Sequence, residues 1–414
     1  MKIGNLIYTM LITNFMVGCT DESTKAFFGD REQNRVIVVD VEKMKLSEPT
    51  HEVFTGHQIT YTADKVFEKP KVYAVNRGSN AIDVINTNTH ELTKTIALQH
   101  FPRSSEAMNE KLHLNETSGM DKPMASIIDI HNDEVIATVG TNEKVDTENN
   151  PNFGGSHATG HPFWLNSNHF VLLDRYNRKV ITYHIEKNNA DKWVTTKLNE
   201  LNTTSSVHQI IPRKGNYKGK DNVFYAIAEG AENIHPSIIK FKLIPNEGLK
   251  KVAELQLHKE GVNVNDMGLH HGDFHPRKKL IYVGSNEGTL FIVDYERMKI
   301  KKTISVGKGA GHTVMIPERN MAIVINHKDV FVSIINTKTH KKIKDIVVSD
   351  ASHLVDKAMI QAHPKYHVSK YADYFYAFLT MEGQMYKIDL NRLKLIKKLF
   401  VGGQPTQGSF VSMD

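Results

Sequence analysis

Apolar and polar positions alternate along this chain in short segments, each a few residues long and bounded by turns rich in Gly, Asn and Asp. Such segments predict β-strands rather than helices. One unit recurs: an apolar strand, a Gly/Asn-rich turn, a second apolar strand ending at Asp or Asn, a polar turn and a strand rich in Lys and Thr. The clearest copies span residues 71–98, 280–306, 322–348 and 374–401.

The spacing of these units indicates the architecture. Looser copies at residues 26–54, 112–140, 170–198 and 223–257 bring the total to eight, and the best-matched intervals are about 42–53 residues. That is the period of a four-stranded propeller blade. We therefore predict an all-β fold, a single β-propeller of eight four-stranded blades over residues 26–414. Seven blades is the alternative, because residues 140–160 are irregular.

The two ends of the predicted ring complement each other. The first unit lacks an inner strand, since residues 19–25 are short and polar, whereas the last unit is followed by a surplus strand at 408–413. We predict that this C-terminal strand completes the first blade and closes the ring. Closure would remove the free sheet edges that an open array exposes.

The N-terminal segment has the composition of an export signal. Lys2 is the only charge before Asp21, and residues 3–17 are mostly apolar but too short to span a membrane comfortably. Gly18-Cys19 follows and resembles the lipobox of bacterial lipoproteins, which implies cleavage before Cys19 and lipidation of its sulfur. An ordinary secretory signal is the alternative. We expect a signal peptide at 1–18, a linker at 19–25 and a lipid-anchored location in the periplasm or at the cell surface.

Composition narrows the chemistry. The one cysteine among 414 residues excludes an intramolecular disulfide framework and any cysteine-based zinc or iron–sulfur cluster. The 52 Lys and Arg face 46 Asp and Glu, and the small excess argues against a dedicated nucleic-acid surface. The Lys-rich fourth strands indicate solvated outer edges instead. Histidine is the unusual residue, with 22 copies, about 5% of the chain.

Many of these histidines lie just before the first apolar strand of a recurring unit. That strand is the second strand of its blade, because the inner strand is expected to precede it. His161, His271 and His312 each stand nine residues before that second strand. Equivalent residues of the inner strands face one axis, so imidazoles there can reach a single ion at about 2.0–2.1 Å without a local motif. The candidate metal ligands are His161, His271, His312, His157, His270, His208 and His363.

Two other residues occupy the same column. Arg103 fills it in the third blade, and Gln407 fills it when residues 401–407 are matched to 306–312, so both are candidate cofactor-binding residues. Arg103 suits an anionic ligand, or alternatively a salt bridge to Glu106 or to a carboxylate across the channel. A histidine at such a turn can also be structural and bond the backbone of the next blade. Eight further histidines on strands or outer turns are expected at the surface: His100, His113, His131, His169, His184, His258, His327 and His340.

The blade pattern resembles the YVTN-type propeller repeats, a group that includes the cytochrome d1 domain of nitrite reductase and the propeller of nitrous-oxide reductase. The resemblance covers residues 26–414 and is specific for fold. It implies an axial channel of the kind that holds a histidine-lined copper site or a haem in those families, and a periplasmic zinc chaperone of propeller fold is a third precedent. This sequence lacks a Cys-x-x-Cys-His motif and a copper–thiolate domain, so covalent haem is not expected.

The first hypothesis is an exported propeller lipoprotein that binds zinc or copper through its channel histidines, as a metal carrier or a metal-dependent enzyme. Because metal binding requires neutral imidazoles, it should weaken below about pH 6. The alternatives are a non-catalytic scaffold for protein interactions and a d1-type tetrapyrrole binder or maturation factor. We expect a monomer attached to a membrane by its lipid, an exported protein as partner, and no nucleic acid. No residue pattern assigns catalytic residues.

Overall fold

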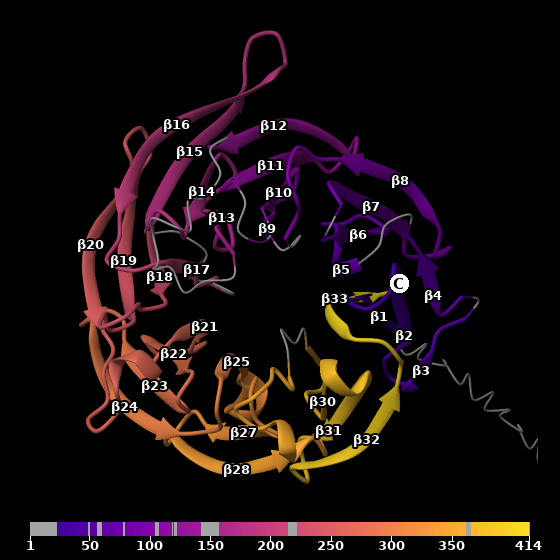
Figure 1. Ribbon diagram of the computed structural model, residues 1–414, viewed down its shortest axis with the longest axis vertical. Coiled ribbons are helices and arrows are strands. Elements are labelled where there is room, and N and C mark those ends of the chain that lie inside the picture. The colour runs from indigo at the N-terminus through magenta and orange to yellow at the C-terminus, as the bar shows by residue number, and fades with distance from the viewer. Residues whose placement is uncertain are drawn as a thin grey trace, which may run out of the picture.

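The computed structural model is an eight-bladed β-propeller, with strands arranged in eight sheets around a central axis (Figure 1). It describes residues 23–48, 50–55, 60–77, 79–103, 107–117, 119, 122–141, 157–213, 222–361 and 366–413. The prediction of an all-β ring of eight four-stranded blades is confirmed. The alternative of seven blades is wrong, because the loosely patterned units at 112–140 and 170–198 each form a complete sheet.

The first blade is built from both ends of the described chain. From the axis outward it contains β33 (Pro405–Ser412), β1 (Thr24–Asp30), β2 (Arg35–Asp40) and an outer edge split into β3 (Lys45–Leu46) and β4 (Glu52–Phe54). Strands β1 and β33 pair antiparallel, with Phe27 opposite Ser409. The predicted closing strand is therefore confirmed, and it begins three residues earlier than the sequence pattern indicated.

The other blades each use four consecutive strands, with the first strand of each nearest the axis (Figure 1). Blade 2 contains β5 (Thr60–Lys65), β6 (Lys71–Asn76), β7 (Ala81–Asn86) and β8 (Leu92–Ala97). Blade 3 contains β9 (Ala107–Met108), β10 (Leu112–Glu116), β11 (Met124–Asp129) and β12 (Glu134–Gly140). Blade 4 contains β13 (Phe163–Trp164), β14 (His169–Asp174), β15 (Lys179–Lys187) and β16 (Trp193–Asn202). Blades 5 and 6 contain β17 (Val207–Ile210), β18 (Val223–Ala228), β19 (Ser237–Ile244), β20 (Gly248–Gln256); and β21 (Leu269–Phe274), β22 (Leu280–Ser285), β23 (Thr289–Asp294), β24 (Lys299–Ser305). Blades 7 and 8 contain β25 (Ala310–Ile316), β26 (Met321–Asn326), β27 (Phe331–Asn336), β28 (Lys341–Val347); and β29 (His367–Val368), β30 (Tyr374–Leu379), β31 (Gln384–Asp389), β32 (Lys394–Phe400).

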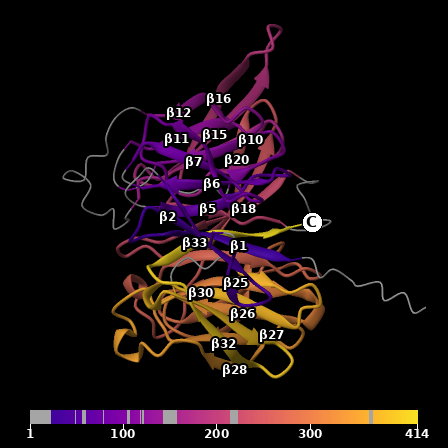
Figure 2. The ribbon, with the colours of Figure 1, turned by 90° about the vertical axis from the view of Figure 1, so that its right-hand side faces the viewer.

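Short 3₁₀ turns link some of these strands: η2 (Val264–Asp266), η3 (Pro317–Arg319), η4 (Ser352–Leu354) and η5 (Thr380–Glu382). Within the described ranges, no helix is long and apolar enough to cross a membrane. The hairpin of β15 and β16 is the longest, and it projects beyond the ring in both views (Figures 1 and 2).

Burial follows the position of a strand within its blade. The second strands are mostly apolar, and β22 and β14 are buried along their whole length, because sheets pack against them from both sides. One such core lies between blades 7 and 8, where Val314 and Ile325 pack with Phe375 and Ala377. The outermost strands are largely exposed, as the Lys-rich pattern of β28 predicted. The blades are thus rigid walls, and the inner strands carry side chains into the channel.

Candidate metal centre

The inner strands of blades 5, 6 and 7 are each irregular at their histidines. The pairing register shifts at His208 in β17, at His270 and His271 in β21, and beside His312 in β25. In a regular strand, successive side chains point to opposite faces, and a bulge re-aims them. Consequently His270 and His271, although adjacent in sequence, both contact the ring of His208, with ring centroids 4.3 and 5.0 Å away.

Three of the histidines form a buried group that we call the inner triad: His161, His208 and His271. One nitrogen of each lies within 4.8 Å of the others, and the side chains are 6%, 3% and 7% exposed. The Nε2 atoms of His208 and His271 are 3.3 Å apart. Bonds of about 2.0–2.1 Å to a tetrahedral zinc ion place neighbouring nitrogens about 3.3–3.4 Å apart, so this pair already has the required spacing.

A second group, the outer triad, adjoins the first. It consists of His270, His312 and His327, with one nitrogen of each again within 4.8 Å of the others. His270 and His312 are half-buried and His327 is buried. The Nδ1 of His312 lies 2.9 Å from the Nε2 of His327, a hydrogen-bonding distance. The rings of His271 and His312 stack with centroids 4.1 Å apart, so the two triads touch.

Carboxylates stand behind two inner-triad imidazoles. Glu116 lies 3.3 Å from the Nδ1 of His161, and Glu229 lies 2.7 Å from the Nδ1 of His208. Arg175 holds Glu229 in turn, with 2.6 Å between Nη2 and Oε2. A carboxylate at Nδ1 favours the tautomer with a proton on Nδ1, which leaves Nε2 to bind a metal and makes it a stronger donor.

Burial keeps the imidazoles of His208 and His327 neutral. It lowers the pKa of His208 to about 3, although Glu229 opposes the shift, and it lowers the pKa of His327 to about 4. Burial alone would raise the pKa of Glu229, but Arg175 and His208 outweigh it and hold that pKa at about 2. For His208 and His327, protons therefore compete with a metal only at lower pH than the value of about 6 expected from an ordinary imidazole.

These shifts predict a pH dependence of stability in the metal-free protein. Burial lowers the pKa of His113, on β10, to about 3 as well. Below pH 6.5 the unfolded chain binds protons on His113, His208 and His327, whereas the folded chain does not. The free energy of unfolding should therefore fall as pH falls from about 6.5 to 4. Each group contributes up to about 1.4 kcal/mol per pH unit. Urea unfolding between pH 7.5 and 5 measures the slope, and His113→Phe should lower it by up to about 1.4 kcal/mol per pH unit. An unchanged slope in that variant would contradict the assignment.

Two glycines make the close approach possible. A Cβ at Gly160 would lie 2.5 Å from the carbonyl oxygen of Val207 and 2.7 Å from that of His208. The N–H of His161 donates to the same His208 oxygen at 2.9 Å, which ties blade 4 to blade 5. A Cβ at Gly311 would overlap the ring of His327. Glycine is therefore required at both positions by space.

The structure brings five of the seven candidate ligands together. His161, His208 and His271 meet in the inner triad, and His270 and His312 in the outer one. His157 stands apart: its Nδ1 accepts a hydrogen bond from the N–H of Gly119 at 2.8 Å, and burial, then Arg103, lowers its pKa. His363 lies outside the described residues.

The two candidate cofactor contacts are both buried. Arg103 is 4% exposed, donates to the carbonyl oxygen of Thr159 and lies 4.0 Å from Glu116, so its carboxylate neighbour in the structure is Glu116. Its expected partner Glu106 lies outside the described residues. Gln407 is 4% exposed on β33, in blade 1, while the triads belong to blades 4 to 7.

Sequence reasoning missed three residues of the centre. His327 was expected at the surface, which is wrong, since it is 4% exposed and belongs to the outer triad. All three lie at the end of the second strand of their blade: His327 follows β26, Glu229 follows β18 and Glu116 ends β10. That end lies beside the start of the inner strand, because the two strands are antiparallel. A search of second-strand ends would have found them. The expectation of surface exposure is also wrong for four other histidines, all buried: His100, His113, His169 and His340.

Comparisons with known proteins agree with this architecture. No family model matches the sequence, and neither does any curated relative. AztD from Citrobacter koseri, in its apo form, superposes with a TM-score of 0.57 and 13% identity over 94% of this chain and 98% of AztD. NirN, a dihydro-heme d1 dehydrogenase, superposes with a TM-score of 0.65 and 10% identity over 94% of this chain and 75% of NirN. The chain shares the propeller fold of these proteins. BamB from Moraxella catarrhalis shares the propeller fold too, with a TM-score of 0.58 and 7% identity over 83% of this chain and 89% of BamB.

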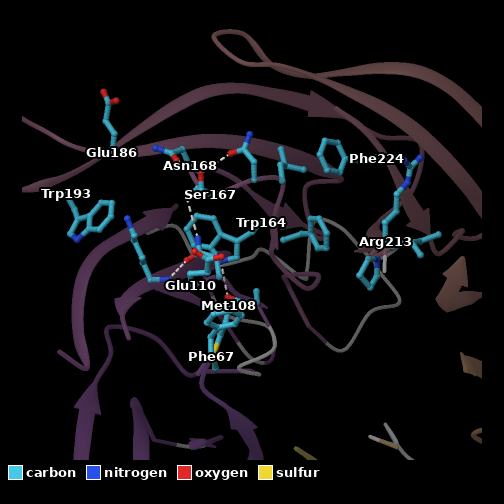
Figure 3. A pocket seen from close by; sticks show the side chains of 18 of the residues that line it. Phe67, Met108, Glu110, Trp164, Ser167, Asn168, Glu186, Trp193, Arg213 and Phe224 are labelled. Atoms are coloured by element: carbon cyan, nitrogen blue, oxygen red, sulfur yellow. Dashed lines mark hydrogen bonds between the residues drawn. The ribbon is translucent and has the colours of Figure 1, made fainter. Parts of the chain in front are cut away.

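A separate pocket of about 920 Å³ lies at the opposite ends of the inner strands, over blades 3 to 5, with Phe67 added from blade 2. Its lining includes both tryptophans of the chain: Trp164 lies beside Met108, with Trp193 to one side and Phe224 to the other (Figure 3). The indole N–H of Trp164 donates to the carbonyl oxygen of Ala107 at 3.1 Å, which fixes the ring between blades 3 and 4. The pocket is aromatic and distinct from the histidine centre.

Proposed function

We propose that this protein is an exported lipoprotein that binds a transition-metal ion, zinc or copper, between His161, His208 and His271 and serves as a metal carrier. The observation that supports it best is the inner triad. Its nitrogens lie within 4.8 Å of one another, two of them are 3.3 Å apart, and two of the rings have a carboxylate at Nδ1. Neutral imidazoles oriented by carboxylates are typical of zinc and copper sites.

The number of ligands favours a site that exchanges its metal. Three imidazoles leave one position of a tetrahedral ion for water or for a ligand of another protein. A receiving protein can bind the ion at that position before the histidines release it. The same open position would let a bound water be activated, so a metal-dependent hydrolase is the second candidate.

The alternatives named from the sequence make different predictions. A d1-type tetrapyrrole binder needs room for a macrocycle, whereas donor atoms within 4.8 Å of one another suit an ion between them. It should change the visible spectrum of added haem. An interaction scaffold would use a surface such as the aromatic pocket, and replacing His161, His271 and His312 together should then leave its function intact.

The metal-binding proposal is tested by the metal content of protein purified without a histidine tag. We expect at least one equivalent of zinc or copper per chain, or a clear rise in the unfolding temperature when either ion is added to the stripped protein. Substoichiometric metal together with no thermal shift would contradict the proposal.

Attachment to a membrane is a separate part of the proposal and rests on Cys19. This residue lies outside the described ranges, and the support is the lipobox-like sequence before it. We expect Cys19→Ser to move the protein from the membrane fraction to the soluble fraction and to abolish incorporation of labelled fatty acid. Two acyl chains on Cys19 would anchor the protein stably, and the variant has no sulfur to carry them. Unchanged membrane partitioning would contradict lipidation.

A further inference from the structure

We propose that the outer triad, His270, His312 and His327, is a second metal site of lower affinity, through which an ion reaches and leaves the inner triad. The exchange role rests on the proposed function, whereas binding at the outer triad stands on its own donors. Three imidazoles favour zinc or copper at this site, as at the first.

The donor geometry supports a second ion. The Nδ1 of His312 and the Nε2 of His327 are 2.9 Å apart, and all three donor atoms lie within 4.8 Å of one another. Widening the 2.9 Å pair by a few tenths of an ångström gives the spacing of about 3.3–3.4 Å around a tetrahedral ion. The other nitrogen of His327 contacts the carbonyl oxygen of Gln361, which fixes the ring orientation.

The outer triad should bind more weakly, for two reasons. The hydrogen bond between His312 and His327 must be broken before an ion can enter, whereas the two Nε2 atoms of the inner triad already have the spacing of ligands. An ion in the inner triad also repels a second cation close by. Glu116 and Glu229 lie directly behind inner-triad rings and compensate the charge of the inner ion first.

Contacts between the triads and their burial suggest the route. The inner histidines are at most 7% exposed, whereas His270 and His312 are half-buried. His270 lies 4.2 Å from His271 and 4.3 Å from His208 between ring centroids, and His271 stacks on His312. An ion in the outer triad is therefore separated from the inner triad by single rings, and small rotations of His270 or His271 would pass it inward.

Gly311→Ala tests the second site with all six histidines in place. The new Cβ would overlap the ring of His327 and must displace it. Titration of stripped natural protein with Zn²⁺ should show two equivalents, the second bound about 10–100-fold more weakly. The variant should lose the weak phase and keep the tight one. Gly261→Ala, where a Cβ meets nothing within 4 Å but the backbone is left-handed (φ 77°), controls for backbone strain away from the triads and should keep both phases.

Two further variants make the result decisive. His312→Phe should also remove the weak phase, and it replaces Gly311→Ala should that variant fail to fold. His208→Phe should remove the tight phase and keep the weak one, so failure of the inner site is distinguished from failure of the outer site. A single equivalent in the natural protein, with Gly311→Ala and His312→Phe unchanged, would overturn the second site.

The exchange role has its own readout. Release of the tightly bound ion to an excess of EDTA should be about tenfold or more slower in His312→Phe than in the natural protein, at equal affinity of the tight site. His258→Phe, an exposed histidine outside both triads, should release at the natural rate. An unchanged release rate in His312→Phe would overturn the route.

Discussion

The His208→Phe protein should bind zinc about 1,000-fold more weakly at the inner triad than the natural chain does. Zinc binding by a protein releases about 10–16 kcal/mol, so loss of one of three imidazoles costs about 4 kcal/mol. His208 is the most buried of the three, and its Nε2 already lies 3.3 Å from the Nε2 of His271. Phenylalanine has a similar volume, so packing in the channel is retained while the donor is lost. Competition titration with a chromophoric chelator measures the change.

The matched control for this variant is His113→Phe. His113 is fully buried on β10 and packs against Tyr73, apart from the triads. Both substitutions remove a buried neutral imidazole, and only His208→Phe removes a proposed ligand. Equal zinc affinity in the two variants would show that the inner triad is not the tight site.

Arg175→Leu should lower the free energy of unfolding by about 3 kcal/mol. Arg175 is 5% exposed and holds Glu229 through Nε at 3.1 Å and Nη2 at 2.6 Å, and it also donates to the carbonyl oxygen of His157 at 2.7 Å. Without the guanidinium, the half-buried Glu229 carboxylate stays beside a neutral His208, and the pKa of Glu229 should rise. Urea unfolding at pH 7.5 measures the loss.

A double variant separates charge from packing. If the unpaired carboxylate causes the loss, then Arg175→Leu with Glu229→Leu should be more stable than Arg175→Leu alone. The surface pair of Lys179 and Glu200, 3.0 Å apart and about one-third exposed, provides the comparison. Lys179→Leu should change stability by less than about 1 kcal/mol. A similar loss in both single variants would contradict a special role of the Arg175 pair.

The fold was largely predictable because propeller blades repeat their polarity. Each second strand is buried on both faces, so runs such as Leu280–Ser285 stand out, and Asp or Asn ends the third strand of most units. The closing strand was predictable by elimination, since one unit lacked a strand and another had one too many. The split outer edge of blade 1, β3 and β4, was not predictable, because the residues between 46 and 52 do not specify which segment pairs with β2.

The site was predictable only along one column. Residues nine positions before each second strand lie at the same level of the ring, which located His161, His271 and His312. The candidate histidines do not form one group on the axis, because contacts between neighbouring blades divide them into two triads. His327, Glu116 and Glu229 reach the site from second-strand ends of different blades. That arrangement depends on register between strands and blades, which no local pattern in the sequence contains.

The central claim is tested most directly by anomalous X-ray diffraction from crystals of the protein equilibrated with Zn²⁺, with data on both sides of the zinc absorption edge. The expected result is a peak about 2.0–2.1 Å from the Nε2 atoms of His208 and His271 and from one nitrogen of His161. A zinc-loaded crystal with anomalous peaks elsewhere on the molecule, and none between these three imidazoles, would contradict the proposed metal centre.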